Sequence, residues 1–288
     1  MTPRVALATY AAAPQLAPDD QLLVPALAAR GIDAAPAVWS DASIDWSSFA
    51  AIVIRSCWDY HRRYAEFMRW LDALDARGCR VWNSTTTVRW NSNKRYLVDL
   101  AGRGVPTVPT RIGAGASARA VAEVAGAEGW TRFVVKPAVS ASAYETHAIA
   151  LPLGDDDRRS IDRVAAQGDV LVQPFLDEVT TDGELSLIFF DGAFSHAAIK
   201  RSRPGDFRVQ TEHGGTVAPI DVMPAIVSQA RRSIEALDEP PLYARVDGVG
   251  DDRSFRLMEL ELIEPHVFLS AADAAVDRFA AAIERRLG

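Results

Sequence analysis

The chain has 288 residues, of which 49% are hydrophobic and 24% charged, a composition typical of a globular enzyme with two or three lobes. Its formal net charge of −7 argues against non-specific nucleic-acid binding, and its two cysteines, which lack C-x-x-C spacing, exclude a zinc ribbon and a disulfide framework. No segment has the apolar length of a signal-peptide core or a transmembrane helix, so we expect a cytoplasmic protein with neither nucleic-acid nor membrane partners.

Residues 1–90 alternate short apolar strands with amphipathic helices. The pattern predicts strands at 5–9, 32–38, 51–55 and 80–82, and helices at 19–30 and 64–77. Asp19 or Asp20 is expected near the N-terminal cap of the first helix. This order predicts a small open α/β domain, and the absence of G-x-G-x-x-G disfavours a dinucleotide site.

Two further lobes are expected, at 91–176 and 177–288. The first is predicted to contain helices at 92–103, 118–127 and 156–167, strands at 131–136, 147–151 and 170–173, and a mobile loop at 139–144. Residues 107–110 are expected to enter a further strand. In the second, Asp191-Gly192 predicts a type I′ hairpin between strands 184–190 and 194–201. Helices are expected at 226–237 and 271–287, and strands at 242–247 and 255–262.

The strands at 242–247 and 255–262 carry the densest pattern of charges among apolar residues. Side chains repeat every two residues along a strand, so Arg245 and Asp247 share one face, as do Glu259 and Glu261. Charges flanked by apolar residues are costly to bury unless they are paired or bind a metal. Three carboxylates and an arginine on adjacent strands suit a magnesium–phosphate site, and a hairpin with a solvated charged face is the alternative.

Basic residues recur at positions where phosphate could bind. Lys136 ends the apolar strand that begins at Phe133, and Lys94 lies where a helix is expected to start. The chain has few lysines for its size, which counts against reading both as ordinary surface residues. The segment 198–215 is also rich in basic and flexible residues, and a solvated hairpin with charged decoration is the alternative there.

In order and approximate spacing, these segments resemble the ATP-grasp ligases. The resemblance runs from Trp82 to Pro265 and includes Arg-x-Asp about a dozen residues before Glu-x-Glu. It implies an ATP-grasp fold with an N-terminal Rossmann-like pre-ATP-grasp domain. It also implies ATP and Mg²⁺ as cofactors, with Mn²⁺ as an alternative metal.

The resemblance also assigns roles to individual residues. Arg245 and Arg208 would stabilise charge during phosphoryl transfer, with Lys200 near the nucleotide. Asp247, Glu259 and Glu261 match the metal ligands, although the family usually has Asn at the third position, so the second metal site is open to change. The nucleotide itself would be held by Lys94 and Lys136 on the phosphates, by the hinge residues Gln173, Phe175 and Leu176 at the adenine, and by Asp177 or Glu184 at the ribose.

The segment after the strand at 51–55 offers candidate substrate ligands. Together with residues 89–97 and 259–265, it looks most like the branch of ATP-grasp enzymes that cyclises O-ureido-serine to cycloserine. Simple capping of the next helix by Asp59 is the alternative. The candidates are Arg55, Ser56, Trp58, Asp59 and Tyr60, with His213 and Gly214 from the basic loop.

The predicted activity is therefore an ATP- and magnesium-dependent carboxylate–amine ligase that works through an acyl phosphate on a small amino-acid-like substrate. Ring closure within one molecule, ligation of two molecules as in glutathione synthetase, and non-catalytic ATP binding all stay open. The partner is expected to be a small carboxylate or amine, and a homodimer is a common state for such enzymes.

Overall fold

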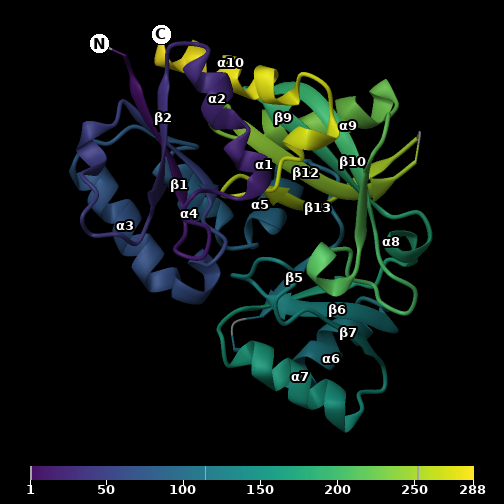
Figure 1. The fold of residues 1–288 in the computed structure, drawn as a ribbon. Coiled ribbons are helices and arrows are strands. Elements are labelled where there is room, and N and C mark those ends of the chain that lie inside the picture. The colour runs from purple at the N-terminus through teal and green to yellow at the C-terminus, as the bar shows by residue number, and fades with distance from the viewer. Residues whose placement is uncertain (1, 114, 252) are drawn as a thin grey trace.

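The computed structural model describes residues 2–113, 115–251 and 253–288. Within them the chain forms three sheets with helices packed on their faces (Figure 1). The architecture is mixed α/β, as the sequence predicts.

The N-terminal sheet is parallel and has the order β2-β1-β3-β4. Its strands are β1 (Arg4–Thr9), β2 (Asp33–Val38), β3 (Ala51–Ser56) and β4 (Val81–Trp82). The helices are α1 (Pro18–Gln21), α2 (Leu23–Ala28) and α3 (Tyr64–Ala76). The expected long first helix is divided in two, and Asp19 and Asp20 lie in its first turn, near the N-terminal cap as expected. Ala17 is the N-cap residue, and both aspartates are buried in tertiary contacts.

A second sheet, β5-β8-β6-β7, is antiparallel and is covered by α6 (Ala118–Ala127) and α7 (Asp155–Ala165). Its strands are β5 (Arg111–Gly113), β6 (Arg132–Pro137), β7 (His147–Ala150) and β8 (Val170–Pro174). Residues 107–110 lead directly into β5, as expected, and Thr107 also makes an isolated bridge to Leu257. The predicted helix at 92–103 is shorter, because a turn containing Lys94 separates α4 (Thr85–Asn91) from α5 (Tyr96–Gly102).

The third sheet is antiparallel, with the order β11-β10-β9-β12-β13. It contains β9 (Glu184–Phe190), β10 (Ala193–Arg201), β11 (Thr216–Pro219), β12 (Tyr243–Gly250) and β13 (Phe255–Glu261). The turn between β9 and β10 has positive φ at Asp191 (53°) and Gly192 (75°), which confirms the type I′ hairpin. Helix α8 (Asp177–Thr181) precedes β9, α9 (Pro224–Glu235) packs on β12 and β13, and α10 (Ala275–Leu287) packs on β9 and β10.

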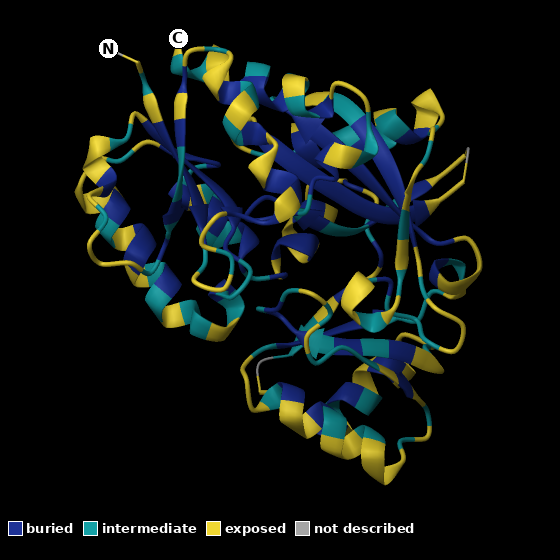
Figure 2. Ribbon diagram, viewed as in Figure 1, coloured by how far each residue is buried: buried dark blue, intermediate teal, exposed yellow. Residues whose placement is uncertain are grey.

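The hydrophobic core does not stop at the boundary between the N-terminal sheet and the large sheet. One cluster of buried side chains joins Val5 and Leu7 of β1 and Leu27 of α2 to Phe190 of β9 and Phe279 of α10. Figure 2 shows these strands as continuous buried ribbon, with exposed residues on the outer helix faces. The C-terminal helix therefore holds the first and third sheets together. Among the described residues, no helix combines the length and apolar character needed to cross a membrane.

Candidate active site

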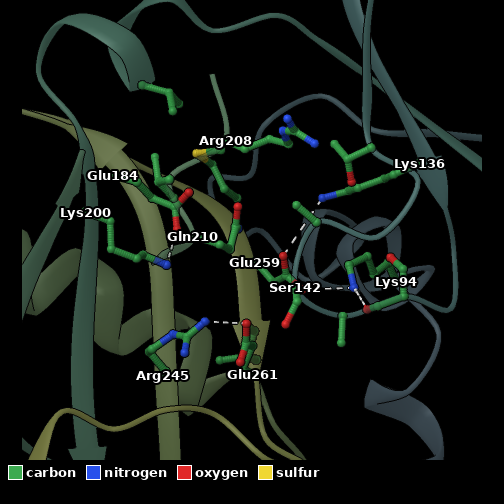
Figure 3. A pocket seen from close by; sticks show the side chains of 18 of the residues that line it. Lys94, Lys136, Ser142, Glu184, Lys200, Arg208, Gln210, Arg245, Glu259 and Glu261 are labelled. Carbon is green, nitrogen blue, oxygen red and sulfur yellow. Dashed lines mark hydrogen bonds and ion pairs between the residues drawn. The ribbon is translucent and has the colours of Figure 1, made fainter. Parts of the chain in front are cut away.

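A cavity of about 510 Å³ lies between the second sheet and the large sheet. Its walls come from β6 and β8 on one side and from β9, β10, β12 and β13 on the other. Loops that follow β3, β6 and β10 complete the walls, so segments far apart in the sequence meet there. Most of the predicted site residues point into this space (Figure 3).

Strand register explains why the charged residues of the large sheet gather on one side. Arg245 lies opposite Glu261 and Asp247 opposite Glu259 in the β12–β13 pair. Directly opposite residues in an antiparallel pair project from the same face of a sheet, so alternation along two strands brings all four together. The spacing of Arg-x-Asp and Glu-x-Glu thus specifies the cluster.

Asp247 is the buried centre of this cluster and, unlike Arg245, Glu259 and Glu261, lies behind the cavity lining rather than in it. Its carboxylate accepts hydrogen bonds from Lys200 at 3.0 Å, from Arg245 at 2.9 Å and from Ser186 at 2.6 Å. Burial by itself would raise the pKa of Asp247, but Arg245 and Lys200 lower that pKa to about 2. Lys200 also pairs with Glu184, which lies directly opposite it in the β9–β10 pair.

Glu259 joins the large sheet to the second sheet across the cavity. Its carboxylate lies 2.9 Å from the Lys94 ammonium and 3.9 Å from the Lys136 ammonium (Figure 3). Lys94 also donates to the carbonyl of Ser140, in the loop that follows β6. Burial lowers the pKa of Lys136, and the negative charge of Glu259 opposes that shift. Both lysines are therefore held by groups that a bound phosphate could replace.

Glu261 has a different electrostatic environment from Asp247. Its carboxylate accepts a hydrogen bond from Arg245. Burial raises the pKa of Glu261 to about 7, and the negative charges of Glu259 and Asp247 add to the rise while Arg245 opposes it. A divalent cation beside this group would relieve the repulsion among the carboxylates.

Lys94, Lys136 and Lys200 are the only lysines in the sequence, and all of them line the cavity. Apart from histidine, every other basic side chain in the sequence is an arginine. A lysine ammonium is a compact charge that suits phosphate oxygens, so this restriction supports a phosphate-binding function for the cavity.

The carboxylates fit magnesium by their chemistry, because hard divalent cations take carboxylate oxygens and substrate phosphates as ligands. Among the described residues, however, no group of three or more His, Cys, Asp or Glu side chains is arranged as a ready metal site. Each candidate carboxylate is paired with a lysine or arginine instead. When a metal ion and a phosphate bind together, the carboxylates could coordinate the metal while the lysines and the arginine bind the phosphate oxygens.

The other end of the cavity has an apolar slot. Phe175 and Leu176, which follow β8, line it together with Val134 and Met258. The Arg132 guanidinium lies 4.0 Å from the Phe175 ring centre and stabilises its orientation. Apolar and aromatic side chains of this kind suit the face of a flat ring.

The remaining hinge candidates divide between the inside and the outside of the cavity. Gln173 lines the cavity, but its side-chain amide donates to Thr110 at 3.0 Å. Asp177 is outside the lining and pairs with Arg132 at 2.8 Å. Glu184 is inside, so of the two ribose candidates only Glu184 is placed to contact a ligand.

The basic loop after β10 contributes Arg208 to the cavity lining. Arg208 is held by a bidentate pair with Asp206, whose closer contact is 2.8 Å. His213 and Gly214 lie in the turn at the end of this loop and are outside the lining. Gly214 has φ of 83°, so its role in the turn is a backbone one.

Of the N-terminal candidates, Trp58 and Tyr60 line the cavity. Arg55 and Ser56 do not, because both are fully buried and bonded to Asp20, at 3.0 and 2.7 Å. Asp59 accepts from the Trp39 indole at 2.8 Å and also lies outside the lining. Its side chain makes no cap hydrogen bond to the short helix that follows, so the capping alternative is not supported either.

Several lining residues escaped the sequence analysis. Glu264 and His266, just beyond β13, lie in the cavity wall, as do Met258 and Ser140. Glu264 belongs to the segment 259–265 that carried the family resemblance. It lies beyond the end of β13, so the alternation of charged and apolar residues along the strand did not identify it. Ser140 acts through its backbone carbonyl, which side-chain identity does not reveal.

Comparison with known proteins identifies relatives over the whole chain. Residues 5–83 match the family model of the N-terminal domain of D-cycloserine synthetase DcsG. The cycloserine biosynthesis protein DcsG of Streptomyces lavendulae is 34% identical, with 98% of each chain covered.

Solved structures agree with this result. The crystal structure of D-cycloserine synthetase DcsG superposes with a TM-score of 0.90 and 32% identity, over 99% of this chain and 100% of that one. D-alanine–D-alanine ligase from Bacillus anthracis shares the fold at a TM-score of 0.69 and 14% identity, over 99% of this chain and 98% of that one.

Proposed function

The chain belongs to the ATP-grasp ligases, in the family of D-cycloserine synthetase, and from this premise we propose that it closes a ring within an amino-acid substrate. It is an ATP-dependent, ADP-forming carboxylate–amine ligase. The proposed substrate is O-ureido-serine and the proposed product is cycloserine. The observation that carries the ring-closing assignment is 34% identity to the cycloserine biosynthesis protein over nearly the full length of both chains.

The cavity residues supply the parts that phosphoryl transfer needs. Lys94, Lys136 and Lys200 would bind the nucleotide phosphates, and the slot formed by Phe175 and Leu176 would hold the adenine. Arg245 would neutralise charge as the terminal phosphoryl group moves to the substrate carboxylate. These side chains are already fixed by ion pairs and strand register, so little reorganisation is needed at the moment of reaction.

Asp247, Glu259 and Glu261 would hold magnesium, which when bound neutralises charge on the terminal phosphates. Lys200 and Arg245 keep Asp247 ionised, because they lower its pKa to about 2. Glu261 replaces the Asn usual in the family and would add a negative charge, which favours a divalent cation at this place. Manganese is the alternative metal.

The chemistry divides into two steps. First, a substrate carboxylate oxygen attacks the terminal phosphorus of ATP, which gives an acyl phosphate and ADP. A substrate nitrogen then attacks the carbonyl carbon, the C–O bond to phosphate breaks, and the nitrogen loses a proton as the amide forms. When the carboxylate and the oxyamine nitrogen belong to one molecule of O-ureido-serine, this second step closes a ring. Release of cycloserine also requires water to break the bond between that nitrogen and the ureido carbonyl, and the carbamoyl group leaves as carbamate, which decomposes to carbon dioxide and ammonia. The protein contributes positioning and exclusion of water rather than a covalent nucleophile.

The alternative is ligation of two separate molecules. It is favoured by the fold shared with D-alanine–D-alanine ligase. Product mass separates the two, because intermolecular ligation gives a product heavier than the acid and ring closure gives a lighter one.

We expect Mg-ATP and O-ureido-serine to release ADP and phosphate, with a product of lower mass than the acid. Asp247→Asn and Glu259→Gln should each lower kcat by about 10²-fold or more. Glu235→Gln, an exposed position on α9, is the matched control and should leave the rate unchanged. ATP turnover that persists in both active-site variants would contradict the proposed metal site. A heavier product would favour the intermolecular reaction.

The same proposal extends to the organisation of the chain. We propose lobes at 1–90, 91–176 and 177–288, a cytoplasmic location and a homodimeric state. Limited proteolysis and sedimentation velocity test the lobes and the dimer.

A further inference from the structure

Glu264 is a buried carboxylate that the phosphate-transfer machinery does not use. It lies three residues beyond the end of β13, is 8% exposed and lines the cavity. The carboxylates of Glu184, Asp247, Glu259 and Glu261 are each paired with a lysine or arginine. Among the residues that the structure describes, no side chain donates a hydrogen bond to the Glu264 carboxylate or forms an ion pair with it. A buried carboxyl of this kind ionises only when a partner stabilises its negative charge.

The backbone around Glu264 is held unusually firmly. The carbonyls of residues 263 to 266 each accept a hydrogen bond from a side chain distant in the sequence or on another strand. The donors are Tyr243 to residue 263 at 2.7 Å, Trp58 to residue 264 at 3.1 Å, Arg55 to residue 265 at 2.8 Å and Arg245 to residue 266 at 3.1 Å. Successive anchors of this kind fix the position of the Glu264 side chain before any ligand arrives. They also assign Arg55 a positioning function.

The surroundings of Glu264 suit an organic cation. The side chains of Trp58, Tyr60 and Phe268 line the same cavity and present aromatic rings. Aromatic faces attract an ammonium group, and a charge-assisted hydrogen bond to a carboxylate adds strength and direction. Arg245 donates to the carbonyl of His266, two residues beyond Glu264, and lines the same cavity.

Electrostatics within the cavity point the same way. Burial raises the pKa of the Glu264 carboxyl well above its usual range, and the negative charge of Glu261 raises it further. The positive charges of Lys94 and Arg245 oppose this shift, but the pKa of Glu264 still rises overall. A cation bound beside Glu264 would supply the positive charge needed to stabilise its ionised carboxylate.

We propose that Glu264 binds the α-ammonium group of the amino-acid substrate and thereby selects amino acids over the corresponding acids that lack an amine. This inference rests on the proposed ligase function and names the group that recognises its substrate. The α-amine held in this way is a recognition element, and the nitrogen that closes the ring is a different atom of the substrate.

The test compares O-ureido-serine with 3-(ureidooxy)propanoic acid, which lacks only the α-amine. Wild type should prefer the amino acid by about 10²-fold in kcat/KM, since a buried charged hydrogen bond contributes roughly 1.5–3 kcal/mol. Glu264→Gln should abolish most of this preference by raising KM for the amino acid, with KM for ATP unchanged. Glu264→Asp, which keeps the charge, should retain part of the preference, and Glu235→Gln on the outer face of α9 should retain all of it.

Titration calorimetry with the same two compounds, in the presence of Mg-ADP, gives a second measurement that does not require turnover. Tighter binding of the amino acid to wild type than to Glu264→Gln supports the inference even when no ADP is released, in which case only the proposed reaction fails. An equal preference in wild type and Glu264→Gln, in turnover or in binding, overturns the inference and leaves the ligase function standing. The inference is also overturned if Glu264→Gln weakens binding or turnover of both compounds by the same factor.

Discussion

At the scale of single residues, the site is a set of ion pairs that a ligand can exchange. Lys94 and Lys136 are held by Glu259, while Lys200 and Arg245 are held by Asp247. Their neighbours offset the cost of burying these particular charges. Binding of nucleotide and metal would then exchange partners without burying a new unpaired charge.

Arg245 is the residue where geometry matters most. Its Nε and Nη2 atoms donate to Asp247 at 3.0 and 2.9 Å, and Nη2 also donates to Glu261. Arg245→Lys keeps the charge but loses the planar set of donors, so we expect kcat to fall by about 10²-fold with little change in nucleotide affinity. Steady-state kinetics and nucleotide titration measure the two effects. An unchanged kcat would show that charge alone is sufficient at this position.

Sequence patterns located these charged residues because strand alternation places them on one face. The same patterns misjudged Arg55 and Ser56. An arginine and a serine at the end of a parallel strand resemble substrate ligands, but here they bond to Asp20, whose position depends on packing of α1. Partners that come from a distant element cannot be read from local spacing. Glu264 was missed for the same reason, since its importance lies in what surrounds it.

At the scale of elements, strands and the hairpin were predictable, whereas helix ends and connections were less so. Asp191 and Gly192 specify their turn through local backbone preference, and the hairpin forms as expected. Segment 107–110 enters β5, as the sequence predicts. It runs extended beside β13, but only Thr107 makes a bridge there, and the second sheet begins at Arg111. Which edge an extended segment joins depends on tertiary contacts.

Asp19 connects two elements and should make stability depend on pH. Its carboxylate accepts from the backbone N–H groups of Leu269 and Ser270, at 2.7 and 2.8 Å. Burial by itself would raise the pKa of Asp19, but hydrogen bonds from Ser270 and Leu269 outweigh it and lower that pKa overall. A carboxyl with a lower pKa in the folded state stabilises the protein above its unfolded pKa near 4, and the benefit is lost as pH falls.

We therefore expect Asp19→Ala to destabilise the protein by about 2 kcal/mol at pH 7 and by less at pH 3. Urea unfolding at the two pH values, followed by circular dichroism, measures the difference. Asp33→Ala, at an exposed position of β2, is the control and should show a small effect at both. A loss that is the same at pH 7 and pH 3 would contradict the role of the ionised carboxylate.

At the scale of the whole molecule, the lobes expected from the sequence share a core. Phe279 of α10 stacks on Phe190 of β9, with ring centres 4.4 Å apart, and belongs to the cluster that includes Val5 and Leu7 of β1. The N-terminal sheet therefore depends on the last helix of the chain. Length and composition indicate two or three lobes, but they do not indicate this dependence, because a shared core is a property of tertiary packing.

Phe279→Ala should lower the stability of the first and third sheets together, by about 3–5 kcal/mol. Six of the seven tryptophans lie in the first ninety residues, so tryptophan fluorescence reports mainly on the N-terminal region. The midpoints by fluorescence and by circular dichroism should shift by the same amount. Val124→Ala, at an exposed site on α6, is the control. A shift in circular dichroism without one in fluorescence would show that the N-terminal region unfolds independently.

The confinement of lysine to the cavity has a practical consequence. An amine-directed reagent can modify only the chain's own N-terminus and the three side chains at positions 94, 136 and 200. Lys94 and Lys200 are buried, Lys136 is half-buried, and all three are paired with carboxylates, so acylation would proceed slowly and would report on opening of the cavity. Isotopic labelling of lysine alone would likewise give a spectrum in which every side-chain signal comes from the cavity. The protein thus carries a built-in set of probes for following nucleotide entry and release without any added label.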